Sequence, residues 1–212
     1  ILVPLSLARH AGPAGAGRDF GVYLLLLGHA FRFVEIAFIQ KFILFLSNPL
    51  YSFAVVLIGF LLFAWLGSAF SEWFARRLPW RSVSPVTVAV AAIAVLALIY
   101  VKLLPVVFAA FIGLADAARI ALSLALIAPL AFFMGMPFPL GLRRLSESAP
   151  GFVPWAWGIN GFASVVSAVL ATLLAIEFGF NAVIVLALVL YAIAAWDEAL
   201  SRCRRWHPAS SR

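Results

Sequence analysis

Charged residues are scarce in this chain. Only 11% of its 212 residues are Asp, Glu, Lys or Arg, and 66% are hydrophobic, whereas a soluble domain carries about a quarter charged residues. A soluble fold of this length has too little interior to hide so many apolar side chains. The composition therefore excludes a soluble globular domain, and it makes the lipid bilayer the first expected partner.

The chain also lacks the residues that build covalent, metal or cofactor sites. Its single cysteine, Cys203, can form neither a disulfide within the chain nor a cysteine-based metal cluster. No glycine-rich nucleotide loop follows a strand pattern, and no phosphate loop or zinc signature is present. His10 and His207 flank the apolar region while His29 lies inside it, so no Ser-His-Asp set can be argued. We expect no catalytic residue, metal or cofactor in this chain.

Long apolar runs dominate what remains. A spanning helix needs about 20 apolar residues, and continuous rather than alternating runs favour helices over a membrane barrel. The runs predict an all-α, polytopic membrane helix bundle of about six transmembrane helices. Their approximate ranges are 21–46, 50–70, 85–104, 117–140, 157–178 and 181–200.

Shorter segments complete the organisation. Residues 105–116 are apolar but too short to span, so they predict a surface or re-entrant helix. The glycine- and alanine-rich stretch 11–17 is typical of a flexible linker. The predicted domains are an N-terminal tail and linker at 1–19, a transmembrane domain at 20–200 and a basic tail at 201–212.

The distribution of arginine predicts the topology. With six spans, one side of the membrane holds Arg9, Arg18, Arg76, Arg77, Arg81, Arg143, Arg144, Arg202, Arg204, Arg205 and Arg212. The loops near 47–49, 105–116 and 178–181 hold no Lys or Arg. The positive-inside rule then places both termini in the cytoplasm of a multi-pass protein of the inner (plasma) membrane. The net charge of +7 is thus a topology signal, and no nucleic-acid partner is expected.

The first predicted span carries polar residues. His29, Arg32, Glu35 and Gln40 fall within an arc of about 140° at 100° per residue, which predicts a polar face toward the bundle. A charge inside the membrane is costly and indicates a functional site by default. Arg32 and Glu35, three residues apart, can also pair directly. Two interpretations stay open: a contact for a proton, ion or substrate, and a structural pair that locks helix packing.

Prolines interrupt the fourth predicted span. Pro129, Pro137 and Pro139 free backbone carbonyls and can kink or break a helix. Broken helices line sites in transporters, but this break lies near the predicted cytoplasmic end. We therefore favour a helix exit over a binding site.

Small residues recur along the fifth predicted span. They are Gly158, Gly161, Ser164, Ser167, Ala168 and Ala171. Small residues on one face permit close helix contact, and Asn160 can hydrogen-bond across such a contact. We favour a packing role over ligand binding.

Three stretches together resemble a known family. They are residues 33–46, 128–141 and 154–165. These stretches are similar to the C-terminal membrane region of bacterial spermidine synthase-like integral membrane proteins, and the resemblance covers about residues 20–198. The chain departs from the family at Arg32, where an apolar residue is usual, and at Ser47, where glycine is usual.

The resemblance implies a soluble nucleotide-binding domain, similar to aminopropyltransferases and methyltransferases, upstream in the same polypeptide. The chain begins with Ile1 rather than Met, and we expect such an upstream part. The membrane domain would anchor that enzyme, or feed it a lipophilic or polyamine substrate, without catalysing the reaction itself.

Two alternatives remain. Six spans with both ends on one side are also the layout of half a major facilitator-like transporter, and a purely structural anchor would need no site. A water-accessible polar cavity around Glu35 and Gln40 would favour transport. A tightly packed bundle with Arg32 bonded to Glu35 would favour the anchor.

Overall fold

The computed structural model describes residues 16–78 and 84–206, and within these ranges short turns connect helices and no strand is present. The elements are α2 (Ala16–Leu46), α3 (Pro49–Arg77), α4 (Pro85–Phe111), α5 (Asp116–Met134), α6 (Pro137–Ser148), the short 3-10 helix η2 (Pro150–Phe152), α7 (Val153–Phe178) and α8 (Phe180–Trp206). Six helical segments of the described chain are long and apolar enough to cross a membrane, with α5 and α6 together forming one of them. The predicted all-α bundle of six spans is confirmed.

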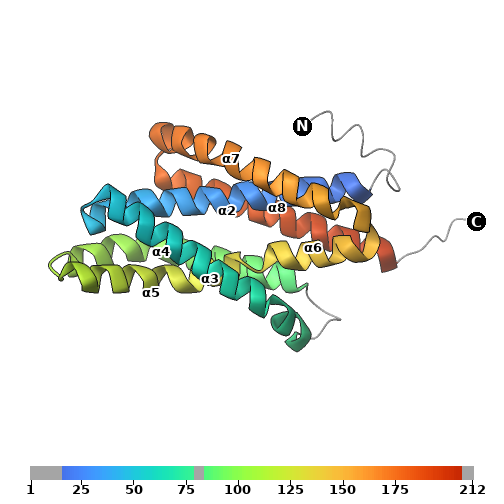
Figure 1. Ribbon diagram of the computed structural model, residues 1–212, viewed down its shortest axis with the longest axis horizontal. Coiled ribbons are helices and arrows are strands. Elements are labelled where there is room, and N and C mark those ends of the chain that lie inside the picture. Colours follow the sequence, from blue (N-terminus) through green and yellow to red (C-terminus); the bar gives the residue numbers. More distant parts are fainter. Residues whose placement is uncertain (1–15, 79–83, 207–212) are drawn as a thin grey trace, which may run out of the picture.

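Helix α2 is the centre of the bundle. It packs against α3, α5, α6, α7 and α8, and Figure 1 shows it running between α7 and the α3 side of the molecule. Its central apolar window is 61% buried, whereas those of the other five spans are 22–39% buried. The side chains of Val34, Phe38 and Phe42 are completely buried. A helix that is apolar on most of its sides is stable only when neighbouring helices or lipid surround it.

Two glycines bring α3 and α5 together backbone to backbone. A Cβ atom added to Gly67 would lie 1.8 Å from the carbonyl oxygen of Phe132. One added to Gly135 would lie 2.0 Å from the carbonyl oxygen of Ala64. Only glycine leaves room for this approach, which is typical of helix packing in membranes.

Helix α4 corrects the prediction for residues 105–116. The chain forms no separate surface or re-entrant helix there, because α4 continues through Pro105 to Phe111 and only a short turn precedes α5. A proline removes one backbone hydrogen bond, but in lipid the remaining polar groups still need helical partners. Leu104, directly before the proline, is buried. The packing therefore holds the helix together across Pro105.

The fourth span is interrupted but does not end at its prolines. Helix α5 ends at Met134, and α6 begins at Pro137 after only Gly135 and Met136. The chain resumes there as a helix of 12 residues, and the choice of a helix exit over a binding site stays a prediction. Pro137 occupies the start of α6, where a missing N–H costs nothing, while Pro129 lies inside α5 without ending it. The fourth span ends at Ser148 rather than at the predicted residue 140.

The tails also differ from the predicted boundaries. Helix α2 begins at Ala16, so the end of the expected linker is helical, and residues 11–15 lie outside the described chain. Helix α8 continues to Trp206, past the expected start of the basic tail at 201. Residues 207–212 lie outside the described chain.

Candidate functional site

The predicted interior ion pair is present on α2. Nη1 of Arg32 donates to Oε2 of Glu35 over 2.5 Å. The Glu35 side chain is completely buried, whereas that of Arg32 is 34% exposed. Of the four residues on the predicted polar face, only Glu35 is fully enclosed, and His29, Arg32 and Gln40 are half-buried. The bundle therefore encloses the acid and leaves its cation at the edge.

The carboxylate of Glu35 has one partner. Its second oxygen, Oε1, is buried and makes no hydrogen bond within the described chain. The residue as a whole is 0% exposed. The negative charge is therefore compensated by Arg32 alone, in surroundings where a lost partner is costly. This geometry matches a tightly packed bundle rather than a water-accessible cavity around Glu35.

His29 is occupied within its own helix. Its Nδ1 donates to the carbonyl oxygen of Leu25 over 2.8 Å, and its ring meets the edge of Phe33. A histidine bound in this way satisfies its polar atom without a ligand. The structure thus places His29 beside the interior ion pair but does not join it to Glu35.

Helices α2 and α7 meet at a glycine that the sequence analysis did not single out. A Cβ atom added to Gly28 would lie 2.8 Å from Cβ of Ala163 and 3.1 Å from Oδ1 of Asn160. Asn160 therefore lies at the predicted helix contact, half-buried. The residue that permits this approach is Gly28 on α2, because glycine has no side chain that would collide with α7.

The predicted packing role of Gly158 and Gly161 is wrong within this chain. Both are exposed, and a Cβ atom added to either would meet nothing within 4 Å. Ser164 is half-buried. The buried positions of α7 are Ala156, Ala163, Ser167, Ala171 and Ala175. Small residues occur on more than one face of this helix, and their spacing alone does not tell which face turns inward.

A second buried ionic cluster joins three elements at the arginine-rich end. Glu198 on α8 is 6% exposed and is paired with Arg144 on α6. The hydroxyl of Ser84, which caps the start of α4, donates to Oε2 of Glu198 over 2.5 Å. A carboxylate beside a helix N-terminus is also stabilised by the helix dipole. The cluster therefore fixes α4, α6 and α8 to one another.

Tyr23 fixes α6 from the side of α2. Its hydroxyl donates to the carbonyl oxygen of Pro137 over 2.9 Å, and its ring fills the space that a side chain on Gly141 would need. The interruption between α5 and α6 is thus filled by protein atoms. Neither Tyr23 nor Glu198 was predicted as a site residue from the sequence. Glu198 could have been found, because an acid within the last predicted span is itself a signal of a site.

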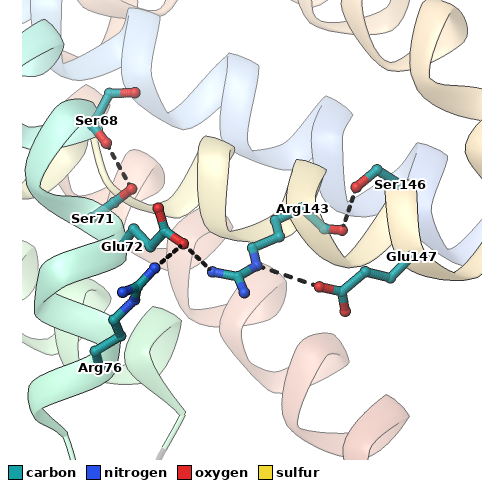
Figure 2. A network of polar contacts seen from close by, with 7 residues as sticks. All are labelled: Ser68, Ser71, Glu72, Arg76, Arg143, Ser146 and Glu147. Carbon is teal, nitrogen blue, oxygen red and sulfur yellow. Dashed lines mark hydrogen bonds and ion pairs between the residues drawn. The ribbon is translucent and has the colours of Figure 1, made fainter.

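An exposed network joins α3 to α6 at the same end. Oε1 of Glu72 accepts hydrogen bonds from Arg76 and Arg143, each over 2.9 Å. Nε of Arg143 also donates to Glu147 over 3.3 Å. Figure 2 shows Glu72 between the two arginines, with Ser71 and Ser146 bonded to backbone carbonyls beside them. All four charged side chains are at least half exposed, so the network belongs to the surface.

At the opposite end of the bundle, Lys41 and Arg119 connect neighbouring helices close to their turns. Nζ of Lys41 donates to Oδ1 of Asn181 over 2.7 Å, which ties α2 to the start of α8. Arg119 donates to the carbonyl oxygen of Phe45 over 3.0 Å and pairs with Asp116. Ser47, in the turn between α2 and α3, has φ of 59°, a backbone conformation that favours glycine. These contacts hold the ends of neighbouring helices together.

The chemistry that these residues can perform is limited. The described residues contain no group of three or more His, Cys, Asp or Glu placed to hold a metal ion. The acids Glu35 and Glu198 are both paired with arginine. The Arg32–Glu35 pair lies within α2, whereas the cluster around Glu198 joins α4, α6 and α8. No protein-family model, curated protein or solved structure matches the chain.

Proposed function

We propose that this chain is a multi-pass anchoring domain of the inner (plasma) membrane, which holds a soluble transferase-like domain at its arginine-rich side. The observation that carries this proposal is the burial of Glu35, whose side chain is 0% exposed and is paired with Arg32. A transport site must exchange its ligand with water, whereas an anchor needs a closed bundle. The enclosed acid meets the second requirement.

The cluster around Glu198 supports the same role. It joins α4, α6 and α8 at the end that the positive-inside rule places in the cytoplasm. A soluble domain attached to that end would be held by these three helices. Interhelical hydrogen bonds inside a membrane contribute about 0.6 kcal/mol each on average, so the two contacts of Glu198 add modestly to the packing of these helices.

The partner domain is proposed from the family resemblance. Ser47 offers one point of support, because its φ of 59° is a conformation that favours glycine, and glycine is usual there in spermidine synthase-like membrane proteins. A soluble domain of that family would bring the cofactor-binding sheet and the substrate pocket, neither of which has a counterpart among the helices described. The catalytic chemistry would then reside outside residues 20–198.

The coding sequence that adjoins the codon for Ile1 tests the partner directly. We expect it to encode alternating strands and helices with a glycine-rich cofactor loop. Six further apolar spans without a soluble unit would overturn the proposal and favour a transporter half. The same result would make Glu35 the first residue to examine in flux assays.

A transporter half remains the second candidate, and the interruption at Gly135 and Met136 is the observation that favours it, since broken helices line transporter sites. Proteoliposomes that contain the purified full chain and a pH-sensitive dye separate the two roles. The anchor predicts no proton or solute flux above that of empty liposomes. Flux that Glu35→Gln abolishes would support transport and contradict the anchor.

A further inference from the structure

The outward face of α3 changes from apolar to basic residues at the arginine-rich end. Along most of the helix this face is apolar, with Ile58 60% exposed and Trp65 65% exposed. It ends at Trp73, which is 56% exposed, and at the exposed Arg76 and Arg77. Tryptophan followed by basic residues marks the depth at which a spanning helix leaves the hydrocarbon and meets the lipid headgroups.

The two adjacent arginines have different partners. Arg76 shares Glu72 with Arg143, and Arg143 also pairs with Glu147. In this network two acids balance two arginines. Arg77 lies outside it, and among the described residues no acid pairs with it. Its guanidinium carbon lies 5.1 Å from the centre of the Trp73 ring. Of Arg76, Arg77 and Arg143, Arg77 is therefore the one whose charge no acid among the described residues balances.

The surroundings of Arg77 fit one kind of ligand. A guanidinium group binds phosphate oxygens through paired N–H donors, and contact with an aromatic ring leaves those donors without an acceptor. The exposed ring of Trp73 suits the boundary between hydrocarbon and headgroups. A ligand at this place needs a phosphate beside Arg77 and an apolar part along the exposed face of α3.

We propose that Arg77 and Trp73 form a binding site for the phosphate of an anionic phospholipid. The occupant is a lipid rather than a soluble phosphate, because the site is the continuation of the apolar stripe that contains Ile58 and Trp65. This site is independent of the proposed anchoring role, and neither depends on the other being correct. It would fix α3 at a defined depth in a membrane that carries anionic lipid.

Native mass spectrometry of the full chain in detergent tests the site. The protein is titrated separately with phosphatidylglycerol, phosphatidylcholine and inorganic phosphate. We expect phosphatidylglycerol to bind more tightly than phosphatidylcholine, and Arg77→Gln to weaken it about fivefold, the effect of one basic residue near an anionic surface. Trp73→Leu should weaken it less. Inorganic phosphate should neither bind at comparable concentrations nor displace the lipid.

Arg76→Gln is the matched control, because it removes the same charge from the neighbouring, compensated position. It should leave the preference for phosphatidylglycerol nearly unchanged. Equal losses in Arg76→Gln and Arg77→Gln would overturn the site in favour of a diffuse charge effect. Equal binding of the two lipids, or competition by inorganic phosphate, would also overturn it. Unchanged thermal unfolding of Arg77→Gln without added lipid will show that the variant folds.

Discussion

Two contacts between arginine and glutamate lie in opposite surroundings in this molecule. Arg32 and Glu35 are 2.5 Å apart on the central helix, with side chains 34% and 0% exposed. Arg143 and Glu72 are 2.9 Å apart between α6 and α3, with side chains 51% and 54% exposed. The distances are similar, but the acid of the first pair is fully enclosed, whereas both side chains of the second pair are half exposed. Burial, more than distance, sets what an ion pair contributes to stability.

The largest effect is expected from Glu35→Ala. The substitution leaves Arg32 without its counterion in the middle of the central helix, and breaking a buried pair costs about 3–5 kcal/mol. Arg32 is partly exposed, so we expect a loss near the lower limit, about 3 kcal/mol. Unfolding of the purified chain in lipid nanodiscs, followed by circular dichroism, measures it.

The double variant Arg32→Leu with Glu35→Leu is the control for that prediction. Replacing a whole buried pair with apolar residues is often neutral or stabilising, so we expect stability close to that of the original chain. Stability of Glu35→Ala equal to that of the original chain would contradict the importance of the pair.

Glu198→Ala extends the comparison to a pair whose acid is 6% exposed rather than 0%. Arg144 and Ser84 both lose Glu198, but Arg144 lies at the arginine-rich end of the bundle, where its partly exposed side chain can turn toward water. We expect a loss of about 2 kcal/mol, smaller than for Glu35→Ala, in the same unfolding experiment. Glu198→Gln, which keeps an acceptor for Ser84, should lose less. A loss larger than that of Glu35→Ala would reverse the ranking by burial.

Gly135→Ala examines packing without charge. Its new Cβ would lie 2.0 Å from the carbonyl oxygen of Ala64, so α3 and α5 must separate, at about 1–3 kcal/mol. The matched control is Gly161→Ala, where the space is open and the change should stay within about 0.5 kcal/mol. Thermal unfolding of both variants decides the point. Equal destabilisation would refute the assignment of the close contact to α3 and α5.

The smallest effect is expected from Glu72→Ala on the exposed network. Surface ion pairs contribute little, because water and ions screen them. Helix α6 also keeps its contacts with Tyr23 and Glu198. We expect a slight loss of thermal stability at low salt that disappears at high salt. A large, salt-independent loss would show that the network is as important as the interior pair.

Sequence reasoning succeeded where the cause is local. The apolar runs predicted the six spans, and the spacing of Arg32 and Glu35 predicted their contact, since residues three apart on a helix are neighbours. It failed at residues 105–116, because a segment judged too short to span by itself is largely the continuation of the preceding helix, which runs through Pro105 to Phe111. It also failed at Gly161, because the spacing of small residues does not reveal which face another helix covers.

The helical class of this protein and the number of its spans can be read from the order of its residues, because hydrophobicity and backbone hydrogen bonding act along the chain. The contacts of Gly67 with Phe132 and of Glu198 with Arg144 become visible only in the folded bundle. These partners are more than 50 residues apart in the sequence. Their pairing depends on how helices rotate and cross, which is set by the shapes of all the side chains that pack between them.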